Sequence, residues 1–442
     1  MRVLHGRGIF WTICMLLLTG KAAAQTYPNT YNSPSYGAPA TIARVEPQPP
    51  APPADPVYVG TGVYGGPTQS PAPVQVQKDD YKAAMSGDWN SCAPPVWFGS
   101  AGAVFFKRQE YDRRLSCYTD ESIPSMHYRD AGMPTTVGPN ITFGRYLGCG
   151  NTGVQFVYWG LYPSTQYANQ YANQTDGNVH STPDWSGIGY PDWSGIGYNP
   201  NVDPPVSNVY DNAQRHELQR NFSVHNFEIN FLSFSNTYGN GCGSSTACGF
   251  GNGYSPSFRY SFLGGFRYIN FNENFLFSAD ADDTVWDSSD NERHYLVDVK
   301  NRLAGFQVGG RTDYFFTESL SVFATGKTGI FGNSMSMHQS IYGPTGYAFV
   351  TNPVSSNLGK PYDIYGSKTN VSFVADFSVG GSYYITKCLS VYAGYQVVAV
   401  TGVAEANDQI PTAFYQLQDN SHIRDDGTLI LHGAFAGVGY NW

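Results

Sequence analysis

The segment VSFVADFSVGGSYYI, residues 371–385, decides the fold class of this chain. Its odd-numbered residues are apolar or small, and its even-numbered residues are largely polar, with Asp376 near the centre. Successive side chains of a β-strand point to opposite faces, so this alternation predicts a strand with one apolar and one polar face. Such a strand separates an apolar environment from water or from polar groups.

The same alternation recurs from about residue 89 to the last residue. Residues 309–324 and 380–393 are similar in sequence, and each fits two strands joined by a tight polar turn. A looser copy begins at Gly264 and is predicted to turn at residues 272–274. Short turns at one end and long loops at the other are typical of outer-membrane barrels. The long connections are expected at 282–292, 339–368 and 403–426.

Counting the strands predicts an all-β chain that forms a transmembrane antiparallel up-and-down β-barrel. Bacterial barrels usually have an even number of strands, so a twelfth strand is placed near 206–217 and twelve is the expected total. No segment beyond the N-terminus approaches 18 consecutive apolar residues, whereas a barrel strand needs only about 9–11 residues. The other eleven expected strands are 96–107, 139–148, 152–162, 220–234, 256–270, 273–284, 293–316, 319–338, 369–386, 389–402 and 427–442.

The first 24 residues are predicted to be a cleavable signal peptide. Arg2 and Arg7 form a positive region, an apolar stretch follows, and small residues end at Ala24. Residues 25–88 are rich in Pro, Gln and Ala and are expected to form a disordered periplasmic linker. This linker is interpreted as an inert spacer or, less favoured, as a tether toward the cell wall. The barrel domain is then 89–442.

The last strand carries an expected assembly signal. Val438, Tyr440 and Trp442 alternate with small or polar residues, and the chain stops on the aromatic residue. An amphipathic final strand with an aromatic end is what the barrel-assembly machinery is expected to recognise. The alternative, an ordinary edge strand of a soluble sandwich, would leave a Trp exposed at the last position.

The charge balance excludes a nucleic-acid partner. The formal net charge is −9, and cleavage of the signal peptide would remove three basic residues and no acidic one. An acidic chain without a basic stripe does not match the electrostatic pattern of nucleic-acid binding. Outer-membrane lipid is the expected environment of the apolar strand faces.

Residues with catalytic or metal-binding chemistry form no recognisable motif, so no enzyme activity, metal or cofactor is expected. Cys242 and Cys248 lie close together and are candidates for a small disulfide in an exported protein. Four further cysteines, Cys92, Cys117, Cys149 and Cys388, can pair in three ways. The acidic loop near 280–290 does not have EF-hand spacing and is interpreted as solvated. His225, His294, His338 and His432 lack an adjacent Ser or Asp motif.

Two loops contain tandem repeats. Residues 183–190 are repeated unchanged at 191–198, and 166–169 are repeated at 170–173. Perfect copies predict an exposed loop whose lengthening costs little. Stacking of sugars on its Trp and Tyr residues is a less favoured interpretation.

If the apolar faces meet lipid, the charged residues on the opposite faces point into the lumen. A basic residue on the lipid face near the midplane would cost about 2–4 kcal/mol, so the alternation is physically forced. Inward charges of both signs would either line a water-filled constriction or pair across the lumen and rigidify a closed barrel. The candidates are Glu228, Arg259, Arg267, Arg311, Asp313, Lys327 and Asp376.

The chain resembles the putative beta-barrel porin family of planctomycete outer membranes. The residues that carry the resemblance are Trp97-Phe98-Gly99, Phe227-Glu228-Ile229-Asn230, the run 263–269 and Tyr440-Asn441-Trp442, and it covers about 89–442. It implies a barrel in the cell outer membrane with a transport function. We therefore expect a porin that passes small solutes by diffusion. The alternatives are a non-conducting barrel whose long loops make surface contacts and, less favoured, a secreted soluble carbohydrate-binding β-protein.

Overall fold

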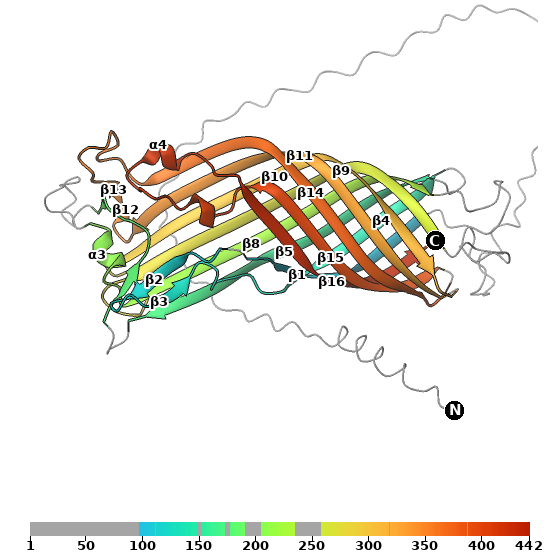
Figure 1. Cartoon of the computed structure of the whole chain (residues 1–442), viewed down its shortest axis with the longest axis horizontal. Helices are drawn as coiled ribbons and strands as arrows, with labels where there is room; N and C mark the ends of the chain where they lie inside the picture. Colours follow the sequence, from blue (N-terminus) through green and yellow to red (C-terminus); the bar gives the residue numbers. More distant parts are fainter. Residues whose placement is uncertain are drawn as a thin grey trace, which may run out of the picture. The chain divides into compact units, whose positions relative to one another are not determined.

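The computed structural model describes residues 97–442, except for 111, 148–151, 173–176, 191–204, 235–257, 318 and 387. Ten antiparallel strands close into an up-and-down barrel, in which each strand pairs with its neighbours in the chain and β1 pairs with β16 (Figure 1). The ten are β1 (Trp97–Arg108), β4 (Thr136–Leu147), β5 (Thr152–Tyr171), β8 (Arg215–Phe234), β9 (Phe258–Asp280), β10 (Glu292–Phe315), β11 (Leu320–Gly343), β14 (Asp363–Tyr384), β15 (Leu389–Val403) and β16 (Gly427–Asn441).

Short elements lie in the connections between the barrel strands. They are β2 (Leu115–Thr119), β3 (Pro124–His127), β6 (Val179–Ser181), β7 (Ile188–Gly189), α3 (Ser207–Tyr210), β12 (Gly346–Tyr347), β13 (Phe349–Val350), η1 (Asn407–Gln409) and α4 (Leu417–Asn420). Among the described residues, no helix has both the length and the apolar character that crossing a membrane requires. The predicted signal peptide (1–24) and the rest of the segment before β1, including the linker (25–88), lie outside the described residues.

The all-β, antiparallel, up-and-down barrel is confirmed, but the predicted total of twelve strands is wrong. Residues 272–274 do not turn, because β9 continues through them and pairs in register with β8 on one side and β10 on the other. The strand placed near 206–217 is also absent, since Ser207–Tyr210 forms the short helix α3. A turn was expected at 272–274 because the segment from Gly264 loosely resembles the two hairpin repeats, whereas β9 runs through it for 23 residues.

The two ends of the barrel differ largely as expected, except that the connection between β8 and β9 at the turn end, 235–257, is long in sequence and lies outside the described residues. At the turn end, β1 begins beside the end of β16, and the hairpins β10–β11 and β14–β15 turn at 316–319 and 385–388, which confirms both repeats. At the loop end lie the connections 109–135, 172–214, 281–291, 344–362 and 404–426. The loop end carries α3, α4 and the short strands and lies opposite the C-terminus in Figure 1. Three of these connections match the predicted long loops.

The outer wall is apolar toward the turn end and polar toward the loop end. Phe306 and Ile330 are 76% and 62% exposed, and similar rows of exposed Phe, Val and Tyr run across neighbouring strands. These rows do not pack against a second sheet, which argues against a soluble sandwich. Closer to the loop end, outward positions become polar, as at Asn272 and Ser336. The strands from β8 to β14 have 20 to 24 residues each, so they extend well past the apolar band.

A charge placed in the apolar band is expected to destabilise the barrel in a lipid bilayer, and the same charge above the band is not. Ile330→Arg should lower the free energy of unfolding by about 2–4 kcal/mol, because the guanidinium would enter hydrocarbon. Ser336→Arg is the matched control, since Ser336 lies on the same face of β11 and is exposed above the band. Urea unfolding in lipid vesicles measures both variants. Equal losses for the two would contradict the placement of the band.

Candidate functional site: a lumen closed in layers

Four of the predicted lumen residues meet inside the barrel, and we call them the mid-lumen cluster: Glu228, Arg267, Lys327 and Asp376. Arg267 on β9 donates from Nη1 to Asp376 Oδ2 on β14 at 3.1 Å, although β10 and β11 lie between these strands. Lys327 Nζ on β11 contacts both carboxylate oxygens of Glu228 on β8, at 3.1 and 3.0 Å. Contacts between strands that are not neighbours pass through the lumen. The charges therefore pair across it.

Amide side chains complete the mid-lumen cluster. Gln307 Nε2 donates to Glu228 Oε2 at 2.8 Å, and Gln396 Nε2 donates to Asp376 Oδ1 at 2.8 Å. Arg267 Nε donates to Asn226 Oδ1 at 2.6 Å. Two positive and two negative charges thus lie in a shell of amides. The side chains of Arg267 and Glu228 are 0% exposed, and that of Lys327 is 13% exposed. Because a buried charge is tolerated only when it is paired and hydrogen-bonded, this arrangement is neutral and closely fixed.

The other three predicted lumen residues lie apart, near the turn end. Arg311 donates from Nη2 to Asp313 Oδ1 at 2.8 Å and covers the ring of Phe323, with its guanidinium carbon 4.1 Å from the centroid. Arg259 lies over the ring of Phe315 at 4.5 Å. The Arg311 side chain is 40% exposed, so this charge meets solvent at the mouth of the barrel. Side-chain direction was predicted here, but the grouping of the seven residues into two sites was not.

A second buried ion cluster, nearer the loop end, was missed by the sequence analysis. We call it the upper cluster: Arg108, Glu110, Arg220, Glu273 and Glu405. Arg108 Nη1 contacts Glu273 Oε1 at 2.8 Å, and Arg220 Nη2 contacts the same oxygen at 2.5 Å. Arg108 also contacts Glu405 Oε2 at 2.9 Å, and Arg220 contacts Glu110 Oε2 at 3.0 Å. Two guanidinium groups therefore form ion pairs with three carboxylates.

The order of the layers can be followed along a single strand. Inward residues of β9 alternate between charged and apolar layers, and each is at most 1% exposed. From the turn end to the loop end they are Arg267, Ile269, Phe271, Glu273, Phe275 and Phe277. Ile269 and Phe271 belong to a buried apolar layer that includes Val224, Leu303 and Phe331 from neighbouring strands. A ten-strand barrel is narrow enough for wall side chains to fill it, and here they do.

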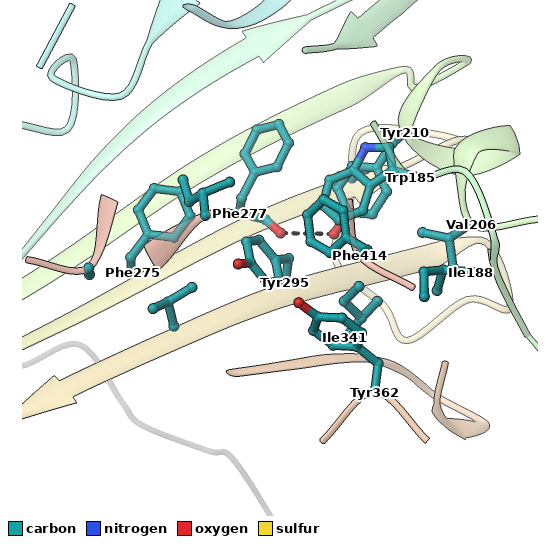
Figure 2. Close-up of a cluster of buried hydrophobic side chains, with 14 of the residues drawn as sticks. Trp185, Ile188, Val206, Tyr210, Phe275, Phe277, Tyr295, Ile341, Tyr362 and Phe414 are labelled. Carbon is teal, nitrogen blue, oxygen red and sulfur yellow. Dashed lines mark hydrogen bonds between the residues drawn. The ribbon is translucent and has the colours of Figure 1, made fainter. Parts of the chain in front are cut away.

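Above the upper cluster, loops fold into the mouth of the barrel and form an aromatic plug (Figure 2). Its members are Trp185, Tyr210, Phe275, Phe277, Tyr295, Tyr362 and Phe414. The Trp185 ring stacks between Tyr210 and Phe414, with centroid distances of 4.1 and 4.5 Å, and its Nε1 donates to Ser181 Oγ at 2.6 Å. Tyr210 anchors the plug to the wall by donating to the backbone oxygen of Phe277 at 3.0 Å. Three loops and two strands supply the plug.

The plug contradicts, for the first copy of the longer tandem repeat, the prediction of an exposed loop. In the first copy, 183–190, Trp185, Ile188 and Tyr190 are buried, because they fill the mouth of the barrel. The second copy, 191–198, lies outside the described residues. Residues 166–171 of the shorter repeat belong to β5 and pair with β8. Aromatic residues in a loop can therefore signal an internal contact as well as an exposed surface.

The remaining predicted residues are the cysteines, the acidic loop and the assembly signal, and only part of them lies in the described ranges. Cys242 and Cys248 lie outside the described part of the chain. Cys388 is disulfide-bonded, whereas Cys117 is free and buried, so the idea that all four further cysteines pair is wrong. No group of three or more His, Cys, Asp or Glu in the described ranges is arranged to hold a metal ion. Val438, Tyr440 and Trp442 lie about half exposed at the turn end.

The candidate histidines take part in local pairs on the wall. His225 Nδ1 lies 3.1 Å from the hydroxyl of Tyr158, and His432 Nδ1 lies 2.6 Å from the hydroxyl of Tyr395. His338 Nε2 lies 2.7 Å from Asp363 Oδ1. In the acidic loop, Glu292 Oε1 accepts the backbone N–H groups of 287–289, so its carboxylate stabilises the loop backbone. These contacts give each group a structural role.

The chain thus has the fold, the apolar outer band and the charged interior of a membrane-embedded barrel. Residues 243–428 match the family Putative beta barrel porin-7 (BBP7). This match spans β9 to the start of β16 and agrees with the resemblance inferred from the sequence. A planctomycete origin stays a prediction. No curated protein matches the chain.

Several solved structures resemble the fold. Outer membrane protease OmpT from Escherichia coli is 11% identical, with 79% of this chain and 97% of that chain covered and a TM-score of 0.40. A Pseudomonas aeruginosa FadL homologue is 8% identical, with 79% and 90% covered and a TM-score of 0.23. Acinetobacter baumannii CarO is 10% identical, with 79% and 98% covered and a TM-score of 0.21. At these values the likenesses say nothing about activity or substrate.

Proposed function

We propose that this protein is a porin-type barrel of the cell outer membrane that keeps its lumen closed at rest and admits small solutes only after the lumen packing rearranges. The match to the porin-7 family supports the transport class. The main observation in favour of a closed lumen is the series of side-chain layers that fills it from the mid-lumen cluster to the aromatic plug. Side chains in each layer are buried, so free diffusion through this conformation is blocked.

The second candidate is a non-conducting barrel that displays its loops. The described parts of 109–135, 172–214, 344–362 and 404–426 favour it, because they contribute buried side chains to one core at the mouth of the barrel. For both candidates we propose that the barrel-assembly machinery recognises Val438, Tyr440 and Trp442. The leader is then a spacer or a link to the cell wall.

Planar-bilayer conductance separates the two candidates. Wild-type protein is expected to show rare steps, and Glu228→Ala/Arg267→Ala to raise the open probability at least tenfold, because the paired deletion loosens the mid-lumen cluster without leaving a net charge. Arg311→Ala, at the turn-end mouth, should make the steps that occur more cation-selective, since it removes an exposed positive charge.

Heat-modifiable migration on a gel must show that every variant is folded. If folded wild-type protein and the double variant both lack conductance steps, the porin function is wrong and the non-conducting barrel stands.

A further inference from the structure

We propose that Gly402–Gln409 forms a proton-controlled strap across the lumen, held in place while Glu405 is protonated and loosened when Glu405 is ionised. This inference deepens the proposed function and rests on it only for the effect on conduction. The strap begins where β15 ends and includes η1.

The strap crosses the lumen, because its backbone bonds to strands that are not neighbours of β15. Ala404 N donates to Asn301 Oδ1 on β10 at 2.9 Å, and Asn301 Nδ2 donates back to Ala404 O at 2.8 Å. Ala406 N donates to Glu273 Oε2 on β9 at 3.0 Å. On β11, Asn333 Nδ2 donates to Gly402 O at 3.1 Å. Inward polar side chains on three strands therefore hold one short piece of chain.

The Glu405 side chain extends the strap to the opposite wall. It contacts Arg108 on β1 at 2.9 Å, whereas the backbone on either side of it is bonded to β9 and β10. Gly427 makes room for it, since a Cβ at that position would lie 2.9 Å from Glu405 Cγ. Ala404 and Ala406 are 0% exposed. Both alanines belong to the same buried cluster as Trp185 and Phe414, so the strap adjoins the aromatic plug at the level of the upper cluster.

Ionisation of Glu405 gives the upper cluster an excess negative charge. Arg108 on β1, Glu110 just after β1, Glu273 on β9 and Asp408 in η1 are the charged groups that face Glu405. Arg220 on β8 acts on Glu405 indirectly, because it pairs with Glu110 and Glu273. Asp408 itself contacts Arg114 at 3.1 Å. Protonation of Glu405 leaves two guanidinium groups with two carboxylates in the cluster. Ionisation adds a third carboxylate, which the two guanidinium groups do not balance.

The direction of the pH effect follows from the environment of Glu405. Burial raises the pKa of Glu405 to about 7. The attraction of Arg108 lowers this pKa, whereas the carboxylates of Glu273, Asp408 and Glu110 raise it. The strapped state therefore binds the proton more tightly than a released strap, in which Glu405 would titrate near 4.5. Burial also raises the pKa of Asp408, in the same direction. The strap is tightest in acid and loses this stabilisation as the pH rises from 4.5 to 7.

Hydrogen exchange on the full-length folded barrel tests the strap without requiring conduction. The rate for the backbone amides of Ala404 and Ala406 is measured in wild type and in Glu405→Gln, which mimics the protonated state. The ratio of the two rates cancels the intrinsic pH dependence of exchange. With wild type divided by Glu405→Gln, this ratio should be about 4 at pH 5 and about 300 at pH 8, as pKa values of 4.5 and about 7 imply. Asp419→Asn, an exposed acidic residue on the same loop, should behave as wild type.

Conductance over the same pH range separates failure of the strap from failure of the proposed function. A ratio that stays near one from pH 5 to pH 8 overturns the strap, whatever the conductance. A ratio that rises while folded protein never conducts supports the strap and removes the porin function. If both hold, open probability rises with pH in wild type and stays low in Glu405→Gln. Glu405→Ala provides a second variant and should also lose the pH dependence.

Discussion

Arg267→Met is expected to lower the free energy of unfolding by about 3–5 kcal/mol, the cost of leaving a buried charge without its partner. Methionine keeps most of the side-chain volume, so the loss measures charge and hydrogen bonding more than a cavity. Glu228 and Asp376 would then share only Lys327 inside the lumen. Urea unfolding in lipid vesicles, followed by tryptophan fluorescence, measures the change.

Two further variants make this result specific. Arg302→Met removes an arginine of β10 that faces outward and is exposed, so its effect should stay within about 0.5 kcal/mol. Arg267→Met/Asp376→Asn restores neutrality and should recover part of the stability that Arg267→Met loses. If Arg267→Met is no more damaging than Arg302→Met, the mid-lumen cluster does not hold the barrel together.

Trp185→Ala is expected to open the head of the barrel while the wall below stays folded. A buried Trp replaced by Ala typically costs about 3–5 kcal/mol, and Trp185 is 1% exposed and stacked on both sides. The loss should fall on the loops, because Phe414 and Tyr210 lose their shared partner. Hydrogen exchange of 404–426 should become faster, and exchange of the turn-end half of β9 should not.

Tyr365→Ala is the control for this prediction. Tyr365 is a large aromatic residue at the same end of the barrel, but it is 67% exposed on the outer wall. Its removal should leave exchange in 404–426 unchanged. Unchanged exchange in Trp185→Ala as well would mean that the stacked rings do not hold the loops.

The strand pattern and the direction of the charges were predictable, because two-residue alternation is a local property. Glu228, Arg267, Lys327 and Asp376 were placed inward for this reason. Glu273 lies on the same face as Arg267 by position, but the apolar residues of this strand change from even to odd positions after Tyr268, so an apolar lipid face gave no signal for it. Counting in steps of two from Arg267 through the polar triplet places Glu273 inward, whichever face is apolar.

Contacts across the lumen could not be predicted in the same way. They depend on how ten tilted strands are staggered, which the strand pattern does not encode. Arg108 and Glu273 are 165 positions apart in the chain and meet only because the barrel closes. The burial of Trp185 depends on Phe414, from a loop more than two hundred positions later. The strap was expected only as part of the long connection 403–426.

The pairing of β1 with β16 has a consequence for biogenesis. The amide and carbonyl of Trp97 bond to those of Trp442, and the two strands stay in register from there to Arg108. Arg108 is made early in synthesis, but Glu273 and Glu405 follow much later. The nascent sheet therefore has two open edges, and the charge of Arg108 lacks its contacts with Glu273 and Glu405, until the barrel closes. Joining the first and last strands completes the sheet and satisfies this charge in one event.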